Sequence, residues 1–440
     1  MKNEKVLVIL YRDRFVSYSI NQVLAAIDNV RDVEVVVVDN ERSLMSALTS
    51  SAIDSYRIKV LGFSLLTTRV VNEDFRNFVN DALKLAYSRG FITVAGGPHA
   101  TGDPLDTLGL GFKFVFVGEG EDSFREFLSV LRDGGDIYKV RGLYTLFNGE
   151  PLYTGCRSRV ILDSYPPFPY WRGLFNPIEI TRGCPFGCWF CQVTYMHGCV
   201  QRHRSIDKIL EYCNLMVSRG IRDLRFITPN AFSYGSSRDK LMDLLEKLYL
   251  NIVSKREARV FYGSFPSEVR PDYVDEDIVR FMKNVVSNEK IIVGAQSGSN
   301  RVLNYIRRGH DIEEVYNAVE TIVKHGFTPS VDFIVGFPFE SEHDFRETIL
   351  VMKRIVKMGG EIHMHYFIPL PGTPLAYRKP REIPLWFRKE VSRLIGAGKG
   401  YGNWLNQERI SNMVFQYGFE RSRRISSLLQ HVSEKERCLM

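Results

Sequence analysis

The segment "GCPFGCWFC" (residues 183–191) places three cysteines, Cys184, Cys188 and Cys191, within eight positions. The whole chain has seven cysteines in 440 residues, so cysteine is rare outside this segment. Sparse cysteines that cluster in this way favour a metal site over a disulfide framework. We therefore take this segment as the starting point for the fold and the chemistry.

The number of cysteines in the segment separates the candidate metal sites. A structural zinc ion takes four protein ligands, so zinc would have to recruit His197 or Cys199 as well. A 4Fe-4S cluster also normally takes four thiolates, and three cysteines leave one iron open to a ligand that is not protein. The segment favours a cluster with one open iron, and zinc remains the alternative.

The first part of the chain, residues 1–140, alternates short apolar runs with amphipathic helical patterns. This alternation predicts a parallel, doubly wound sheet of the flavodoxin-like (Rossmann-like) kind, which binds ligands beyond the carboxyl ends of its strands. The expected strands are the runs at 5–10, 33–38, 59–64, 91–97 and 112–118.

A linker rich in turn residues, 141–174, separates this region from a second α/β region at 175–376. The linker contains a hairpin-like Asn148-Gly149 pair. Six apolar runs with helical patterns between them predict a partial (β/α)6 TIM-type barrel, whose loops after the strands carry the chemistry. The expected strands lie at 176–183, 221–230, 258–265, 290–299, 330–338 and 361–375. The cysteine segment follows the first of them, where a catalytic loop belongs.

The last part of the chain, residues 377–440, is basic and has two helical patterns, at 385–395 and 408–432. It contains 13 Lys and Arg against 6 Asp and Glu, an excess that equals the net charge of +7 of the whole chain. A solvated helical face is the simplest explanation, and a nucleic-acid partner is the less favoured one. We expect these helices to lie as a lid across the open side of the barrel.

The overall composition is that of a globular protein, with 45% hydrophobic and 25% charged residues. No apolar run approaches the length of a membrane span. The apolar run near the start of the chain is too short for the core of a signal peptide. We expect a cytoplasmic location and no membrane partner.

The CxxxCxxC spacing, with Phe190 just before the last cysteine, resembles the radical S-adenosylmethionine (SAM) superfamily. Further segments resemble it in the same order: "TPNAFSYG" (228–235), "GSFPSEVRP" (263–271), "GAQSGSNRVLNYIRRGH" (294–310), "DFIVGFPFES" (332–341) and "PLPGTPL" (369–375). The resemblance implies that the open iron binds S-adenosylmethionine and that one electron cleaves it to methionine and a 5′-deoxyadenosyl radical. A one-electron reductant such as ferredoxin or flavodoxin is implied as a partner.

The resemblance also implies which residues contact the cofactors of the barrel. Glycines at 294, 298 and 336 allow the backbone to approach a flat ligand closely. Gln296, Ser297 and Ser299 offer polar groups to ribose or to the methionine carboxylate. The full set of expected contacts is Phe190, Pro229, Asn230, Ser267, Glu268, Gln296, Ser297, Ser299, Ile334 and Gly336.

Families of this kind often carry an N-terminal cobalamin-binding domain, marked by Asp-x-His-x-x-Gly, Ser-x-Leu and Gly-Gly. The last two parts are present here, but Phe15 and Tyr18 stand where the cobalt-binding His and the Gly would be. The expected cobalamin contacts are Ser64, Leu66, Gly96, Gly97, Gly118 and Glu119. Cobalamin would then have no protein nitrogen on cobalt, and His99 is expected to be a loop contact. Alternatively, the domain has lost cobalamin and serves as a substrate-binding or structural module.

Two histidines are candidates for proton transfer. His363 and His365 alternate on an expected strand and so share one face. If that face lines the barrel, they act as catalytic proton donors or acceptors. The other cysteines, Cys156, Cys199, Cys213 and Cys438, are expected to be free thiols.

The leading hypothesis is an enzyme that methylates, or rearranges, an unactivated carbon by cobalamin-dependent radical chemistry. One alternative is methylthio transfer, because "GAQSGSNRVL" resembles the methylthiotransferases. Those enzymes use three further cysteines in an N-terminal domain, and residues 1–155 contain none. The other alternative is a non-catalytic sensor of cobalamin or S-adenosylmethionine. The sequence does not name a substrate, small or macromolecular.

Overall fold

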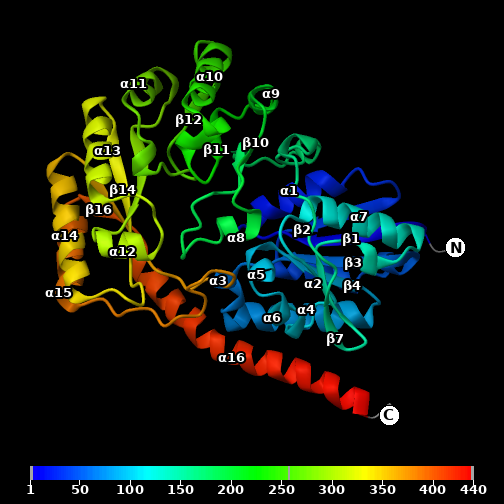
Figure 1. The fold of residues 1–440 in the computed structure, drawn as a ribbon. Helices are drawn as coiled ribbons and strands as arrows, with labels where there is room; N and C mark the ends of the chain where they lie inside the picture. Colours follow the sequence, from blue (N-terminus) through cyan, green and yellow to red (C-terminus); the bar gives the residue numbers. More distant parts are fainter. Residues whose placement is uncertain (1–2, 256–257, 438–440) are drawn as a thin grey trace.

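The computed structural model describes residues 3–255 and 258–437. Figure 1 shows two α/β regions side by side, one formed by the first third of the chain and the other by the middle. A long C-terminal helix, α16 (Trp404–Arg437), runs along one side of both regions. The two-region architecture predicted from the β-α alternation is confirmed.

The first region is built on a seven-stranded sheet with the order β2-β1-β3-β4-β5-β6-β7. The first five strands in this order are parallel, and the last two are antiparallel. Its strands are β1 (Asn3–Tyr11), β2 (Val33–Val38), β3 (Tyr56–Ser64), β4 (Ile92–Gly96), β5 (Phe114–Phe116), β6 (Leu143–Phe147) and β7 (Glu150–Tyr153). The order 2-1-3-4-5 of the parallel part is that of flavodoxin-like folds.

Helices cover both faces of this sheet, as the doubly wound prediction requires. Apolar side chains of α1 (Ser17–Ile27) and α7 (Gly120–Asp133) form the core on one face. The opposite core is formed by helices that share the other face: α2 (Glu41–Thr49), α3 (Thr67–Val70), α4 (Glu73–Ser88), α5 (Gly97–Gly102) and α6 (Pro104–Gly109). The long α4 begins where the side chain of Asn72 accepts the Phe75 N–H, an ordinary N-cap.

The predicted linker is partly wrong, because residues 143–153 belong to the first sheet. Strand β6 pairs with β5, and β7 pairs with β6. Asn148 and Gly149 both have positive φ, which is the hairpin turn that this pair favours. The sheet therefore extends past residue 140, and only the remainder of the segment connects the two regions.

The second region is a partial barrel of parallel strands. One sheet has the order β12-β11-β8 and the other the order β13-β14-β15-β16. An isolated parallel bridge pairs Val269, in the segment after β12, with Val293 of β13. Its strands are β8 (Ile178–Glu179), β11 (Asp223–Ile227), β12 (Arg259–Phe261), β13 (Lys290–Gln296), β14 (Thr328–Val335), β15 (Glu361–Tyr366) and β16 (Gly400–Tyr401). A short antiparallel pair, β9 (Thr181–Arg182) and β10 (Arg202–His203), flanks the cysteine loop.

Amphipathic helices pack on the outside of this barrel. They are α9 (Ile206–Ser218), α10 (Arg238–Leu248), α11 (Glu276–Val285), α12 (Asn300–Tyr305), α13 (Ile312–Lys324) and α14 (Glu342–Lys357). The short helix α8 (Val193–His197) instead follows the cysteine loop, between the two regions. Helices α13 and α14 both begin with a capping box, in which the side chains of the N-cap and N3 residues satisfy each other's backbone N–H groups. All six strands predicted for the barrel are present, and β16 adds a seventh at the edge.

The C-terminal extension is helical as predicted, but the predicted lid is wrong. Helix α15 (Leu385–Gly396) packs on α14, and β16 pairs with β15. The first turns of α16 pack on β15 with Trp404 in the barrel core, whereas Val414 and Tyr417 lie in the core of the first region. Of the described residues of the extension, 377–437, none lines the barrel cavity, and α16 packs first on β15 and then on α6, so the helix links the two regions.

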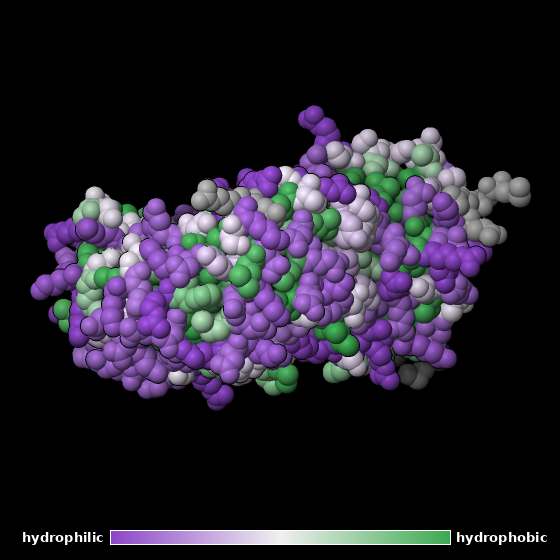
Figure 2. Space-filling model, turned by 90° about the horizontal axis from the view of Figure 1, so that it is seen from above, coloured by the Kyte–Doolittle hydropathy of each residue, from purple (hydrophilic) through white to green (hydrophobic). Residues whose placement is uncertain are grey.

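The surface of the molecule is mostly polar. Figure 2 shows a face dominated by hydrophilic residues, with small separate hydrophobic patches. Among residues 3–255 and 258–437, no helix has the length and apolar character needed to cross a bilayer.

Candidate active site

The backbone of the cysteine loop is held in place by its own neighbours. Gly183 has φ of 90°, and a Cβ there would lie 2.3 Å from the Val200 carbonyl oxygen, so only glycine fits this turn. The Cys184 N–H donates to the Gly198 carbonyl (3.0 Å), and the Thr194 hydroxyl donates to the Cys184 carbonyl (2.7 Å). These contacts fix the start of the loop directly after β9.

All three cysteines of the loop line one cavity of about 510 Å³ inside the barrel. Among the described residues, two groups of three His, Cys, Asp or Glu side chains have all their ligand atoms within 4.8 Å of one another, and neither group contains a cysteine. A tetrahedral zinc ion would hold its sulfur ligands about 3.8 Å apart. The wider arrangement of the three thiols fits a multi-iron cluster better than one zinc ion.

Burial controls the ionisation of these thiols. It raises the pKa of Cys191 to about 12 and raises the pKa of Cys184 above its ordinary value. Thiols with such pKa values stay neutral near pH 7, whereas cluster ligands are thiolates. A cationic iron centre is the partner that would stabilise the thiolate form here.

Charged side chains of both signs lie beside the thiols. Arg308 donates to the Gly294 carbonyl (2.7 Å), lies 3.3 Å from the Glu268 carboxylate and lies 3.8 Å from the Cys188 sulfur. The Gln296 amide donates to the other Glu268 oxygen (3.2 Å). This network holds the Glu268 carboxylate next to the cysteine loop.

Arg270 lines this cavity, and sequence reasoning did not single it out. Its side chain is buried, stacks 3.5 Å from the centre of the Phe186 ring, and pairs with Asp272 through one nitrogen (3.0 Å). Its Nε and Nη1 have no hydrogen-bond partner among the described residues. A buried guanidinium with free N–H groups fits a carboxylate ligand.

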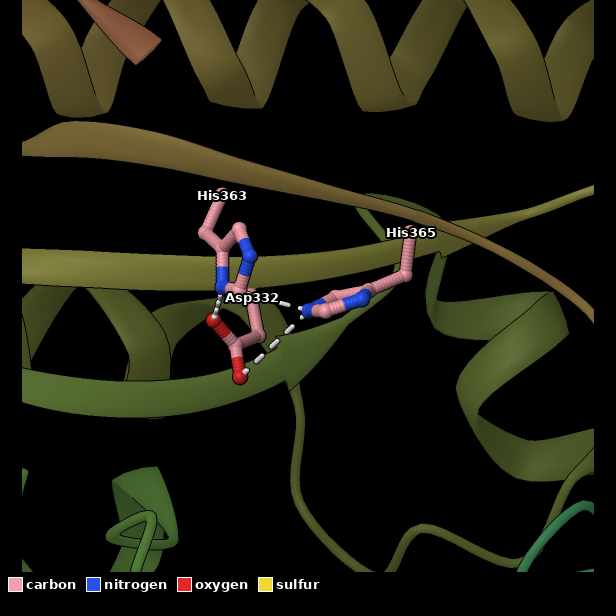
Figure 3. A group of neighbouring side chains, drawn as sticks. All are labelled: Asp332, His363 and His365. Atoms are coloured by element: carbon pink, nitrogen blue, oxygen red, sulfur yellow. Dashed lines mark hydrogen bonds and ion pairs between the residues drawn. The ribbon is translucent and has the colours of Figure 1, made fainter. Parts of the chain in front are cut away.

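The two predicted catalytic histidines line the same cavity as the cysteines. His363 and His365 lie beside Asp332, a residue that the sequence did not mark (Figure 3). Burial raises the pKa of the Asp332 carboxyl, but hydrogen bonds from the two imidazoles outweigh it and lower that pKa below its ordinary value. The barrel cavity therefore has a thiol-lined part and a part lined by an acid and two histidines.

A second cavity, of about 210 Å³, lies at the carboxyl ends of the strands of the first sheet. Ser64, Gly96, Gly97, Gly118 and Glu119 all line it, whereas Leu66 lines neither cavity. These five residues come from the last positions of β3 and β4 and from the segments that follow β4 and β5. Their meeting point is where a doubly wound sheet binds its ligand.

The two glycines of the Gly-Gly pair have different roles. Gly97 has φ of 92°, and a Cβ there would lie 2.5 Å from the Ser64 hydroxyl, so it allows the loop after β4 to pack on the end of β3. Gly96 has ordinary extended backbone, and a Cβ there would meet only a side-chain carbon of Phe116, at 3.7 Å. Gly96 therefore leaves open space in the cavity without backbone strain.

The loop after β1 offers no imidazole to the first cavity. Asp13 accepts the N–H groups of Phe15 and Val16 and pairs with Arg69 (3.1 Å). Phe15 is half exposed, lies next to Arg69 and lines neither cavity. His99 lies in helix α5, not in a loop as expected, and is fully buried between Thr67 and an Asp106 carboxylate.

The two cavities meet at four residues that line both of them: Tyr18, Glu179, Arg182 and His197. Arg182 is buried and pairs with Glu179 (2.6 Å) from its own region and with Glu121 (2.8 Å) from the first region. It directly precedes the cysteine loop in sequence. The junction of the cavities is thus a buried network of charges that spans both regions.

Glu119, expected to contact cobalamin, belongs to this network. It accepts hydrogen bonds from Arg202 and His197 of the second region and from the Val160 N–H (2.7 Å). Burial raises its pKa, but these donors outweigh burial and hold that pKa well below its usual range. Its carboxylate is therefore committed to the contact between the regions.

Comparison with known proteins agrees with both cavities. A model of the radical SAM superfamily matches residues 178–352. A threonylcarbamoyladenosine tRNA methylthiotransferase of Aquifex aeolicus is 30% identical over 311 residues, which cover 69% of this chain and 70% of the relative. The chain belongs to the radical SAM superfamily. A model of the B12 binding domain matches residues 4–128 of this radical SAM protein.

Other relatives share part of the chain or its fold. A tRNA-2-methylthio-N(6)-dimethylallyladenosine synthase of Rickettsia akari is 27% identical over 238 residues, 52% of this chain and 51% of the relative, so the match spans about half of that protein. The structure of the radical S-adenosylmethionine methyltransferase TsrM of Kitasatospora setae, with cobalamin and a 4Fe-4S cluster bound, superposes with a TM-score of 0.68 at 14% identity. It covers 86% of this chain and 74% of that one, and it shows that the two-region fold is shared.

The structure divides the expected cofactor contacts of this radical SAM protein into two groups. Phe190, Pro229, Ser267 and Glu268 line the barrel cavity with the cysteines. The others do not line that cavity: Asn230, Gln296, Ser297, Ser299, Ile334 and Gly336. Ser299, for example, is fully buried and donates to the Asp344 carboxylate (2.7 Å).

The expected role of the three barrel glycines is wrong, because protein atoms fill the space beside each of them. A Cβ on Gly298 would lie 2.4 Å from the backbone of Thr348, and one on Gly336 would lie 2.7 Å from the Tyr366 ring. A Cβ on Gly294 would lie 2.5 Å from the Arg308 guanidinium. These glycines allow close packing of protein on protein, not of protein on a flat ligand.

Proposed function

We propose that this radical SAM protein is a cobalamin-dependent enzyme that methylates, or rearranges, an unactivated carbon. The junction of the two cavities carries the proposal. A cavity lined by three cysteines and a cavity of the B12-binding type share four lining residues, so ligands in the two would be neighbours. A protein that used only one of the two cofactors would not need the two cavities to share lining residues.

The residues of the barrel cavity fit a cluster and an amino-acid ligand. Cys184, Cys188 and Cys191 would hold the cluster, and Glu268 and Arg270 would face an ammonium and a carboxylate group. When bound, the cluster and S-adenosylmethionine supply a carbon-centred radical, and cobalamin supplies a methyl group. A radical is needed because a side-chain base cannot remove a proton from an unactivated carbon.

The first cavity fits cobalamin held without a protein nitrogen. Gly96 leaves room at the end of β4, and Phe15 replaces the usual imidazole ligand without entering the cavity. Tyr18, at the position of the usual glycine, lies between this cavity and the barrel. The protein would thus shape the contact between cobalamin and the barrel cavity mainly through Tyr18.

The substrate of this proposed reaction is a small or partly hydrophobic molecule that enters the barrel cavity. Phe186, Phe190 and Phe265 line it, and Phe265 is strongly exposed. A nucleic-acid substrate is not favoured, because Arg421 and Arg424 of the basic helix are engaged in ion pairs with Asp103 and Asp106. A one-electron reductant such as ferredoxin or flavodoxin and a cytoplasmic location complete the proposal.

Methylthio transfer is the second candidate, because the relatives described above include two tRNA methylthiotransferases. Enzymes of that kind resemble this one in the barrel but use further cysteines in the N-terminal domain. Residues 1–155 of this chain have no cysteine. A non-catalytic sensor would bind the same cofactors without turnover, so turnover separates it from the enzyme.

The experiment is an anaerobic assay of protein reconstituted with iron, sulfide and cobalamin, supplied with S-adenosylmethionine and a one-electron reductant. We expect 5′-deoxyadenosine to form, and none to form with Cys191→Ala. A loaded protein that binds S-adenosylmethionine without cleaving it would be a sensor. Appearance of 2-methylthio groups in added tRNA would favour the methylthiotransferase instead.

A further inference from the structure

A carboxylate and two imidazole nitrogens converge at the wall of the barrel cavity. Figure 3 shows Asp332 of β14 facing His363 and His365 of β15. His363 Nδ1 lies 2.8 Å from Asp332 Oδ1, and His365 Nε2 lies 3.2 Å from His363 Nδ1 and 3.9 Å from Asp332 Oδ2. The pairing of Asp332 with His363 across the two parallel strands sets this geometry.

Protons cannot satisfy all of these contacts. An imidazole nitrogen carries either one hydrogen or one lone pair. If His363 Nδ1 carries a hydrogen and donates it to Asp332, it has no lone pair with which to accept a hydrogen bond from His365. If His363 Nδ1 instead accepts from His365, its lone pair lies against the lone pairs of the Asp332 carboxylate. The ion pairs of Asp332 among the described residues are with these two histidines, so no lysine or arginine neutralises it. One cation between the three atoms would satisfy every contact.

The separations match the ligand shell of a metal ion. Ligands bound at about 2.0–2.2 Å lie about 2.9–3.6 Å apart in octahedral or tetrahedral shells. The observed separations of 2.8, 3.2 and 3.9 Å bracket this range. Two imidazoles and one carboxylate are ligands typical of iron and zinc. We propose that Asp332, His363 and His365 bind a divalent transition-metal ion.

A second group of this kind in the described part of the chain lacks the features of a site. His343, Asp344 and Glu347 also have ligand atoms within 4.8 Å of one another. However, the His343 side chain is 78% exposed, and Asp344 already pairs with Arg301. Arg301 already balances the charge of Asp344, so no further cation is needed there. This surface group therefore serves as a matched negative control.

The ion would face the interior of the barrel. Asp332, His363 and His365 line the same cavity as the three cysteines. Three protein ligands leave further coordination positions open. Resting on the proposed function, the ion would hold an oxygen or nitrogen atom of the substrate, which fixes the distance of the reacting carbon from the cluster. The substrate class is therefore one that carries a hydroxyl, carboxylate or amine.

Gln407 of α16 adjusts the affinity of this site. Its Oε1 accepts the Tyr366 N–H (2.9 Å), so its NH2 group faces His365 Nδ1 (3.3 Å). Without metal, His365 therefore carries its hydrogen on Nε2, and binding of the ion at Nε2 requires the tautomer with the hydrogen on Nδ1, which faces the Gln407 NH2 group. A metal-bound histidine prefers an acceptor for its other N–H, usually a carboxylate or carbonyl. Gln407→Glu supplies such an acceptor and is expected to tighten metal binding about 10-fold.

The test uses protein with its iron-sulfur cluster already reconstituted, so that zinc does not compete for the cysteines. The protein is equilibrated with Zn²⁺, desalted, and analysed for zinc and iron by mass spectrometry. We expect about one zinc per chain, with loss in Asp332→Asn and in His363→Gln and full retention in His343→Gln. Unchanged iron content shows that a variant is folded, and it separates this result from failure of the cluster. Equal zinc in wild type and Asp332→Asn, at every zinc concentration, would overturn the proposal.

Discussion

The two cavities obtain their binding groups in different ways. The barrel cavity takes its three thiols from one segment, residues 184–191, held by hydrogen bonds within the same loop. The first cavity gathers Ser64, Gly96 and Gly118 from the carboxyl ends of three strands. The three thiols are therefore placed by a local motif, whereas the first cavity depends on the packing of a whole sheet.

The cavities also differ in how far they keep the pattern of their families. The CxxxCxxC motif is intact, but the cobalt-binding His of the first cavity is replaced by Phe15. A binding site can lose one ligand and keep its shape when that shape comes from many backbone segments. A cluster that already uses only three thiolates cannot lose another.

The largest expected effect comes from breaking the local motif. Cys188→Ala removes a cluster ligand, and we expect reconstituted protein to lose more than about 90% of its cluster iron. Cys156→Ala is the matched control, because that thiol is exposed and lies in neither cavity. Iron and sulfide analysis with the visible absorption spectrum measures both. A Cys188→Ala protein with normal iron content would place the cluster elsewhere.

The next largest effect comes from the network that joins the cavities. Arg182→Met leaves Glu179 and Glu121 without their buried cation, which is expected to cost about 3–5 kcal/mol of unfolding free energy. Urea denaturation measures the change. Arg132→Met, which breaks the surface pair with Asp133, should change stability by too little to measure. Equal effects of the two substitutions would show that the charge network does not hold the regions together.

A third effect separates the cavities directly. Gly96→Leu fills the first cavity without backbone strain, so we expect cobalamin affinity to fall about 100-fold while the cluster stays intact. Gly396→Leu places the same side chain where no atom lies within 4 Å, and it should leave cobalamin affinity unchanged. Equilibrium titration with cobalamin, followed by absorbance, compares them. Full cobalamin affinity in Gly96→Leu would mean that the cofactor binds elsewhere.

Much of the fold follows from the sequence alone. Each apolar run predicted as a strand in residues 1–140 and 175–376 contains a strand, because periodicity and turn residues act locally. The cysteine spacing likewise places its three residues in one cavity. By contrast, the position of α16 was not predictable, because an apolar stripe indicates that a helix is buried but not against which partner.

The residues that the sequence missed are those brought together by strand register. Asp332 and His363 are far apart in the chain and meet only because β14 and β15 pair in a particular register. Arg270 stands among ordinary loop residues, and only its burial with unpaired N–H groups marks it. A basic residue shortly after the Ser-Glu pair at 267–268 was the one available signal in the sequence.

The smallest predicted effect is a pH dependence within the barrel. Burial raises the pKa of Glu340 to about 8, although its carboxylate accepts the N–H groups of Gly336 and Phe337. A carboxyl whose pKa is higher in the folded than in the unfolded state keeps its proton longer in the folded state. The free energy of unfolding therefore decreases as pH rises between the two pKa values. The loss begins near pH 4.5, its unfolded value, and is complete above about pH 8.

Glu340→Gln removes this titration and keeps an oxygen acceptor for the two N–H groups. Between pH 5 and pH 6.5 we expect the stability of wild type to fall by about 2 kcal/mol relative to that of Glu340→Gln. Urea unfolding at several pH values measures the difference. Parallel stability curves for the two proteins would show that Glu340 stays ionised in the folded state.

The central claim, that cluster and cobalamin occupy neighbouring cavities, is tested most directly by electron paramagnetic resonance of one reduced sample. Protein loaded with both cofactors is reduced to the Co(II) and one-electron-reduced cluster states. Because Tyr18, Glu179, Arg182 and His197 line both cavities, we predict that the two spins couple and broaden each other's signals. Cys188→Ala should show the Co(II) signal alone, without nitrogen splitting from an axial ligand. Two independent, uncoupled signals in the wild-type protein would contradict the account.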